Sequence, residues 1–252
     1  MSSRTVSATA LAPLPEVRAG DDLAALVLAA APDGLRDDDV LVVAHKVVSK
    51  AEGRVRRLAE VTPDQRAQAL AAEHDKDPRV VQVVLDETTE LVRAERGVLI
   101  CRTHHGFVCA NAGVDASNTP DDETVVLLPR DPDASARALR AALRERTGAR
   151  LAVVVADSFG RAWRHGQTDV AIGCAGLAPL EDWRGRVDAR GRELRATWIA
   201  IADEAASAAD LARSKDSRQP AVLVRGLEAH VTEEDGPGAL ALVRPPEEDL
   251  FR

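Results

Sequence analysis

The chain has 252 residues, of which 45% are apolar and 29% charged, so it can bury one large core or two smaller lobes that share an interface. Its net charge of −8 excludes a nucleic-acid scaffold, because neutralising phosphates requires clustered Lys and Arg. The longest candidate membrane segment, Leu23 to Ala31, is far shorter than the roughly 20 residues that span a bilayer, which excludes a membrane helix.

Short Val-rich runs alternate with Ala-rich helical runs along the chain, which predicts a mixed α and β domain. The predicted elements of the first half are a helix over 21–31, a strand over 39–43, helices over 65–74 and 79–92, and strands over 97–102 and 107–110. Thr62 and Pro63 are suited to the N-cap and first turn of the helix over 65–74.

The second half continues the same alternation. Its predicted elements are a strand over 124–128, an amphipathic helix over 133–147 that ends at Gly148, a strand over 151–156, a helix over 196–213 and a strand over 221–225. The continuous apolar run at 151–156 indicates a strand covered on both faces. Residues 231–252 are rich in Glu, Gly and Pro and are predicted to form a loosely ordered or docking tail.

Cysteine usage and the N-terminus indicate a cytoplasmic protein. Cys101, Cys109 and Cys174 form neither an even disulfide set nor a CxxC pair, so we expect reduced, packed thiols. Residues 1–10 contain one Arg and no apolar region followed by a cleavage site, unlike a signal peptide.

A basic stretch, His45 to Arg54, directly follows the predicted strand over 39–43. It contains cations, a hydroxyl and a glycine at a strand end, the usual place for a phosphate-binding loop in a mixed sheet. It lacks the glycines of a Walker A loop. A solvated basic turn is the alternative interpretation.

A second stretch, Asn111 to Asn118, places two Asn, one Asp and a Ser within eight residues. Such hard oxygen ligands suit Mg²⁺ or Mn²⁺, and the amides suit a phosphate or a base. An Asx-rich turn is the alternative, because Asn, Asp and Gly also satisfy tight backbone geometry.

A third stretch, Asp157 to Gly166, begins where the most apolar run ends. Desolvating a carboxylate there is costly unless a cation compensates, so metal binding by Asp157 is the economical interpretation. Arg161 and Arg164 could bind phosphates or carboxylates as bidentate donors. A helix N-cap at Asp157 followed by a charged turn is the alternative.

Two further polar groups carry weaker signals. The mixed charges of 182–194 fit a structural network between loops as well as an anion site. His104 and His105 would point to opposite faces of a strand, so a solvated turn is favoured over a metal pair.

The ordered set of motifs resembles the coenzyme F420-0:L-glutamate ligase family, including the ligase domain of actinobacterial two-domain forms. The resemblance runs from about residue 14 to residue 227, and its specific parts are Gly20 to Leu23, Val48 to Arg54, Asn111 to Asn118, Asp157 to Arg161, Ala171 to Gly173 and Pro220 to Gly226. It implies a ligase domain over 11–230, followed by the tail over 231–252.

The resemblance implies an α+β fold of the family's own type, an intertwined homodimer, and GTP as co-substrate with Mg²⁺ or Mn²⁺ and, as a further candidate, K⁺. The implied metal ligands are Asp115, Asp157 and Ser158. The implied nucleotide contacts are Leu14, Pro15, Glu16, Val17, Lys50 and Asn118, with His45 where relatives place a Ser. Lys50, Arg161 and Arg164 are the cations expected to stabilise developing charge. The stretch Arg213 to Gln219 departs from a Gly- and Glu-containing loop of some relatives, so no metal ligand is carried over from it.

The implied reaction adds L-glutamate to coenzyme F420-0 through an acyl phosphate, and the product is γ-linked when the cycle repeats. Its partners would be small molecules, with no nucleic acid and no membrane. Another metal-dependent carboxylate-amine ligase or phosphatase is the closest rival, since the same Asp and Arg set would serve it. A non-catalytic nucleotide-binding module is the rival from another class.

Overall fold

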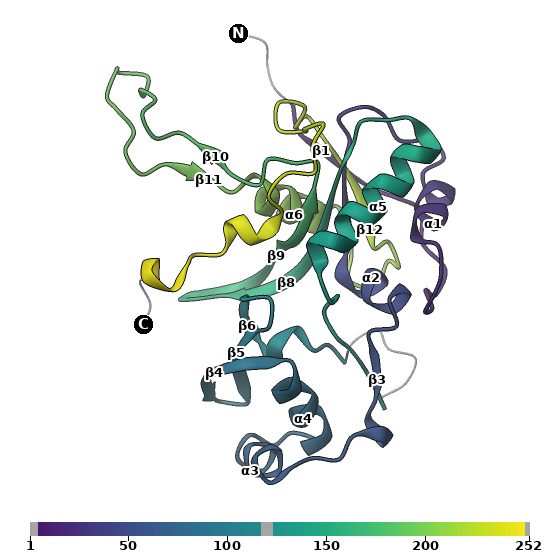
Figure 1. The fold of residues 1–252 in the computed structure, drawn as a ribbon, viewed down its shortest axis with the longest axis vertical. Helices are drawn as coiled ribbons and strands as arrows, with labels where there is room; N and C mark the ends of the chain where they lie inside the picture. Colours follow the sequence, from purple (N-terminus) through teal and green to yellow (C-terminus); the bar gives the residue numbers. More distant parts are fainter. Residues whose placement is uncertain (1–4, 117–122, 250–252) are drawn as a thin grey trace.

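A five-stranded sheet lies at the centre of the molecule (Figure 1). The computed structural model describes residues 5–116 and 123–249. The strand order is β1-β12-β2-β8-β9, with bounds β1 Ser7–Ala10, β12 Ala221–Arg225, β2 Val40–Ala44, β8 Ala152–Arg161 and β9 Arg164–Ala175. β2 and β8 are parallel, whereas the other neighbouring strands are antiparallel. The carboxyl ends of the β2–β8 ladder therefore lie side by side at one end of the sheet.

Helices cover both faces of this sheet and make the fold a mixed α and β structure. The helices of this part of the chain are α1 (Leu23–Ala30), α2 (His45–Ala51), α5 (Pro132–Thr147) and α6 (Ile201–Ala212). Leu41 and Val43 of β2 pack with α1 and α5, whereas Val40 and Val42 pack with α6. This confirms the prediction of a buried strand at 151–156, because β8 pairs with β2 between the same two layers. No helix in the described ranges is long and apolar enough to cross a bilayer.

The termini of α5 follow directly from its sequence. The carboxylate of Asp131 accepts a hydrogen bond from the N–H of Ala134, and Pro132 occupies the first turn. Gly148 ends the helix in the left-handed conformation, at φ 73°, where a side chain would be strained. The predicted helix over 133–147 is confirmed, including its stop.

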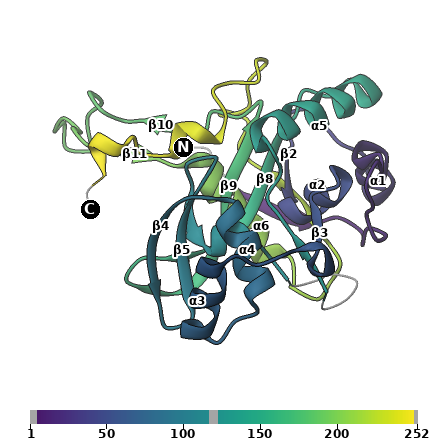
Figure 2. The same ribbon diagram turned by 60° about the horizontal axis from the view of Figure 1, so that its bottom comes forward.

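Between α2 and α5 the chain forms a small lobe with a core of its own (Figure 2). Its elements are β3 (Val55–Arg57), η1 (Leu58–Glu60), α3 (Gln65–His74), α4 (Pro78–Asp86), β4 (Thr88–Glu95), β5 (Val98–Thr103), β6 (Val108–Ala110), η2 (Asn111–Gly113) and β7 (Thr124–Val126). β4, β5 and β6 form an antiparallel sheet, and α3 and α4 pack with it around Val81, Leu99 and Cys101. β3 and β7 pair with each other where the chain enters and leaves the lobe.

Two predicted helix boundaries and one predicted helix cap are wrong. The helix over 79–92 stops at Asp86, because the Thr88 hydroxyl caps the Val84 carbonyl and the following residues pair with β5. The helix over 196–213 begins only at Ile201, because residues 198–199 form a short strand. α3 has the predicted bounds, Gln65–His74, but its N-cap is Asp64, whose carboxylate accepts from the Ala67 N–H, and not Thr62.

An arm, residues 181–199, extends away from the sheet (Figure 1). It starts and ends in the paired strands β10 (Glu181–Asp182) and β11 (Trp198–Ile199). The Arg184 guanidinium lies 4.2 Å from the ring centroid of Trp198 and also pairs with Asp182 at 2.7 Å. These mixed charges therefore pair within the arm itself, and the choice between a network between loops and an anion site stays a prediction.

The C-terminal segment packs along α5. It contains η3 (Ala239–Leu242) and η4 (Pro246–Glu248). The buried Asp133 carboxylate accepts hydrogen bonds from the N–H of Cys174 at 2.8 Å and of Ala239 at 2.7 Å. The Arg140 guanidinium donates to the Thr232 carbonyl at 2.7 Å. The division into a domain over 11–230 and a tail stays a prediction.

Close packing of α5 on β9 predicts a steric limit at Gly173. A Cβ added there would lie 2.2 Å from the carbonyl oxygen of Pro132. We expect Gly173→Ala to lower the free energy of unfolding by about 1–3 kcal/mol, the usual cost of overpacking a core. Urea unfolding measures this. Gly160→Ala is the matched control, because its Cβ would meet nothing within 4 Å, and equal effects of the two changes would refute the packing argument.

Candidate active site

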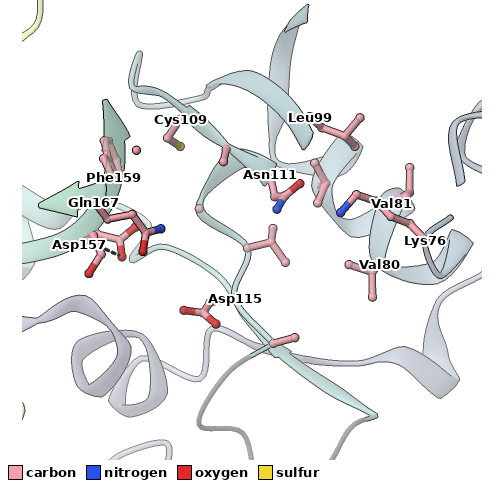
Figure 3. Close-up of a pocket in the computed structure, with 17 residues that line it drawn as sticks. Lys76, Val80, Val81, Leu99, Cys109, Asn111, Asp115, Asp157, Phe159 and Gln167 are labelled. Carbon is pink, nitrogen blue, oxygen red and sulfur yellow. Dashed lines mark hydrogen bonds between the residues drawn. The ribbon is translucent and has the colours of Figure 1, made fainter. Parts of the chain in front are cut away.

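A cavity of about 420 Å³ lies where the C-terminal half of β8 meets the small lobe (Figure 3). Asp157 and Ser158 border it from β8, and Asp115 borders it from the segment after η2. Figure 3 shows the carboxylates of Asp115 and Asp157 at one end of the cavity, and Val81 and Leu99 at the other. The cavity therefore has an acidic end, and its other end combines apolar side chains with Lys76.

Asp157 lies within β8, so its interpretation as a helix N-cap is wrong. Its Oδ1 is 3.3 Å from Nε2 of His45, the first residue of α2. The His45 side chain is 2% exposed, and its Nδ1 lies 3.4 Å from the Ser49 hydroxyl. Ala44 pairs with Ala156 in the parallel ladder, which places the next residue of each strand side by side. The register of β2 and β8 thus brings the histidine to the carboxylate.

Asp115 is held by its backbone and by an ion pair. Its N–H donates to the Val126 carbonyl at 2.9 Å, and its own carbonyl accepts from Val126 at 2.8 Å. Its Oδ2 is 2.7 Å from Nζ of Lys46. Because Lys46 directly follows His45, the first two residues of α2 contact the two carboxylates of the cavity.

The basic stretch after β2 forms α2 and not the predicted loop, since its Lys, Val, Ser and Ala residues continue as a helix to Ala51. Lys50 is largely buried, and its Nζ is 2.6 Å from Oε1 of Glu16. This ion pair joins the segment 14–17, which was expected to contact the nucleotide, to the helix that carries His45 and Lys46. Of the predicted nucleotide contacts, Lys50 and Glu16 therefore touch each other, and His45 lies on the same helix as Lys50.

Ser158 borders the cavity, and its hydroxyl is engaged on the side of β9. Its Oγ donates to Oδ1 of the buried Asp169 at 2.6 Å and accepts from Nζ of Lys215 at 2.8 Å. A hydroxyl with these two partners has one acceptor lone pair left for a ligand.

Arg161 and Arg164 lie at the exposed tip of the β8–β9 hairpin, on either side of a turn that contains Trp163. Arg161 donates to the His165 carbonyl at 2.8 Å. In the part of the chain that the structure describes, neither arginine borders the cavity. Asn118, a predicted nucleotide contact, lies outside the described residues.

Sequence reasoning overlooked several residues around the cavity. Lys46 and Asn111 lie within the stretches His45 to Arg54 and Asn111 to Asn118, in which the sequence assigns metal or nucleotide binding only to other residues. The Asn111 Oδ1 is buried with no hydrogen-bond partner among the described residues, and its backbone is left-handed at φ 51°. Asp169 could have been noticed as a carboxylate that directly precedes the apolar run of β9. Lys215 could not, because its approach to Ser158 depends on tertiary structure.

The acidic end of the cavity fits a hard divalent cation. Mg²⁺ is usually held by one or two carboxylates together with water and substrate phosphates. Asp115 and Asp157 supply two carboxylates, and Ser158 supplies a hydroxyl. Within the described ranges no group of three or more His, Cys, Asp or Glu side chains comes together as a metal cage. The donor set therefore suits a cation that shares its coordination with a bound substrate.

The three cysteines are free and buried, as the sequence predicts. Cys109 borders the cavity, and burial, with a smaller contribution from the charge of Asp157, raises the pKa of its thiol to about 12. Burial also raises the pKa of Cys174 to about 12 and that of Cys101 above its usual value. Thiols with raised pKa values are poor nucleophiles near neutral pH, so we expect these three to react slowly in the folded protein.

Comparison with known sequences gives a consistent result. The sequence model described as F420-0:gamma-glutamyl ligase matches residues 12–226. The chain is 44% identical over 243 residues to a protein of Methanothermobacter thermautotrophicus, covering 95% of this chain and 96% of that one. It is 46% identical over 239 residues to a protein of Methanopyrus kandleri, covering 94% of each. Both relatives are named coenzyme F420:L-glutamate ligase.

The raised thiol pKa values predict slow modification of the native protein. With a pKa of about 12, the thiolate fraction of Cys109 at pH 8 is on the order of 10⁻⁴. We expect Ellman's reagent to titrate almost no thiol in the native chain and three in denaturant. Modification of the native protein becomes measurable only as pH rises toward the raised pKa. Rapid native reaction that disappears in Cys109→Ser would contradict the buried state of this thiol.

Proposed function

Because the chain belongs to the F420-0:gamma-glutamyl ligase family, we propose that it joins L-glutamate to coenzyme F420-0 with GTP as the energy source. The observation that carries this proposal is the pair of carboxylates, Asp115 and Asp157, at one end of a cavity beside the basic helix α2. An acidic pair flanked by cations suits a reaction in which phosphates, a metal and a carboxylate must meet.

Asp115 and Asp157 would hold Mg²⁺ or Mn²⁺, with the Ser158 hydroxyl beside them. The metal would neutralise phosphate charge and so favour transfer of the γ-phosphoryl group. The segment Leu14 to Val17, with His45, Lys50 and Asn118, would bind GTP. The Lys50–Glu16 ion pair supports this assignment because it keeps the segment against α2. K⁺ stays a candidate supporting cation.

The reaction needs activation of a carboxylate, which is a poor acyl donor. A carboxylate oxygen of coenzyme F420-0 would attack the γ-phosphorus of GTP, and the bond to the bridging oxygen of GDP would break. The amine of glutamate would then attack the acyl phosphate, releasing phosphate and a proton and forming the amide. The task of the chain is to position these groups and to balance their charge. Lys46 and Lys50 on α2 are placed to do this from one side of the site.

Arg161 and Arg164 would assist from the hairpin tip, as expected from the resemblance. Their exposed position suits contact with the negatively charged substrates at the mouth of the site better than contact with the transferred phosphoryl group. Lys46 is therefore a better candidate than either arginine for a cation beside the carboxylates, since its Nζ is 2.7 Å from Asp115.

We also propose the homodimer that the resemblance implies. The arm, residues 181–199, extends from the body (Figure 2). It exposes two large apolar side chains. Val187 is 61% exposed and Trp198 is 49% exposed. Such side chains on an extended arm support packing against a second copy of the chain.

Product analysis tests the reaction directly. The chain is incubated with coenzyme F420-0, L-glutamate, GTP and Mn²⁺, and the product is examined by mass spectrometry. We expect glutamyl additions, with GDP and phosphate formed only when both acceptor and glutamate are present. Phosphate release without glutamyl addition would favour a phosphatase or another carboxylate-amine ligase. Bound GTP without turnover would favour a nucleotide-binding module.

Removing one charge from the acidic pair tests the metal assignment. Asp157→Asn keeps the size of the side chain, and we expect turnover to fall on the order of a hundredfold or more because the metal loses a charged ligand. Asp33→Asn is the matched control, since Asp33 is exposed in the turn that follows α1, and it should leave turnover unchanged. Equal rates in both variants would remove Asp157 from the metal site.

A further inference from the structure

Lys215 lies among three oxygen atoms beside the cavity. Its Nζ is 2.8 Å from Ser158 Oγ, 3.0 Å from Asp210 Oδ1 and 3.7 Å from Asp169 Oδ1. These oxygens come from β8, α6 and β9, which are brought together only by the fold. A hydroxyl and two carboxylates around one cation resemble the oxygen donor set of a hard metal ion, but the cation here belongs to the protein.

The central carboxylate of this group is fully buried. Asp169 has a side-chain exposure of 0%, and its Oδ2 accepts a hydrogen bond from the Arg213 guanidinium. Its backbone carbonyl accepts from the Ser207 hydroxyl at 3.0 Å, which ties β9 to α6. A buried carboxylate persists only when it is paired, so Arg213 is required by Asp169, and Lys215 is a second, more distant cation.

The charges of the group balance. Asp169 and Asp210 carry two negative charges, and Arg213 and Lys215 carry two positive charges. A divalent cation added at Ser158 Oγ would therefore meet no net negative charge from these four residues and would be repelled by the ammonium already at that hydroxyl. Without Lys215 the same oxygens would carry a net negative charge and would attract a cation.

We propose that the Lys215 ammonium is a built-in cation that takes the place of a second metal ion at Ser158. The chain then binds one divalent cation, at Asp115 and Asp157, and the lysine supplies the second positive charge at that end of the cavity. The proposal rests on the proposed function for its metal and its nucleotide. In this proposal the Ser158 hydroxyl positions the Lys215 ammonium, and Ser158 is not a metal ligand.

The position of Lys215 suits a cation that also serves the nucleotide. The Leu14 N–H donates to the Arg218 carbonyl at 3.0 Å, so the segment that carries Lys215 touches the segment proposed to bind GTP. The Lys215 side chain is 69% exposed, which leaves its ammonium free to turn from Ser158 toward a bound phosphate. The ammonium would then leave Ser158 and contact the phosphate when the nucleotide binds.

Counting bound Mn²⁺ tests the proposal. The full chain is titrated with Mn²⁺, and free Mn²⁺ is measured by electron paramagnetic resonance. The titration is repeated with a non-hydrolysable GTP analogue, and the Mn²⁺ that the analogue binds in the absence of protein is subtracted. We expect one Mn²⁺ per chain in the wild type and in Lys215→Arg, which keeps the charge. Lys215→Met should gain a second Mn²⁺ site, at least tenfold tighter than any second site in the wild type.

Arg195→Met is the matched control, because it removes one positive charge from an exposed residue of the arm and should still give one Mn²⁺. Two tight Mn²⁺ in the wild type, or one in Lys215→Met, would overturn the proposal. Gain of a site in Arg195→Met as well would also overturn it, since net charge would then explain the effect. If the proposed ligase function is wrong, no glutamyl product forms, but the number of bound Mn²⁺ can still be measured. The two proposals can therefore fail separately.

Discussion

The parallel pairing of β2 with β8 is the constraint on which the site depends. It places the residues that follow Ala44 and Ala156 beside each other, and so brings His45 to Asp157. Burial of both strands between helical layers makes a shift of register costly, because every apolar side chain would change face. The packing of Val and Leu on the two sides of one sheet thus determines the position of a histidine and a carboxylate.

Charge matching is the second organising feature. Around the cavity each carboxylate has a basic partner from another element, as in the pairs Lys46 with Asp115 and Arg213 with Asp169. Such pairs add little net stability when they are exposed, and they are required where a carboxylate is buried. A metal or phosphate bound as proposed would therefore exchange partners with these residues instead of entering an uncharged space.

Local signals in the sequence were sufficient for much of the fold. The buried strands are continuous runs of Val and Ala, and α5 has an Asp cap, a Pro and a terminal Gly. These strands and this helix can therefore be predicted from short stretches of sequence. The errors arose where local preference was ambiguous. The Val-rich residues after Pro78 suit a helix or a strand, and the change from α4 to β4 at Thr88 is decided by pairing with β5.

The sequence by itself determined the mixed α and β class, most element positions, the family and the stretches that contain Asp115, Asp157 and Lys50. Tertiary structure alone decided which of these residues meet. It placed Lys46 at Asp115, Arg161 at an exposed hairpin tip, and Lys215 at Ser158, 57 positions away in the chain. The physical reason is that strand and helix patterns record local burial, whereas contacts between charges distant in the chain depend on the register and packing of whole elements.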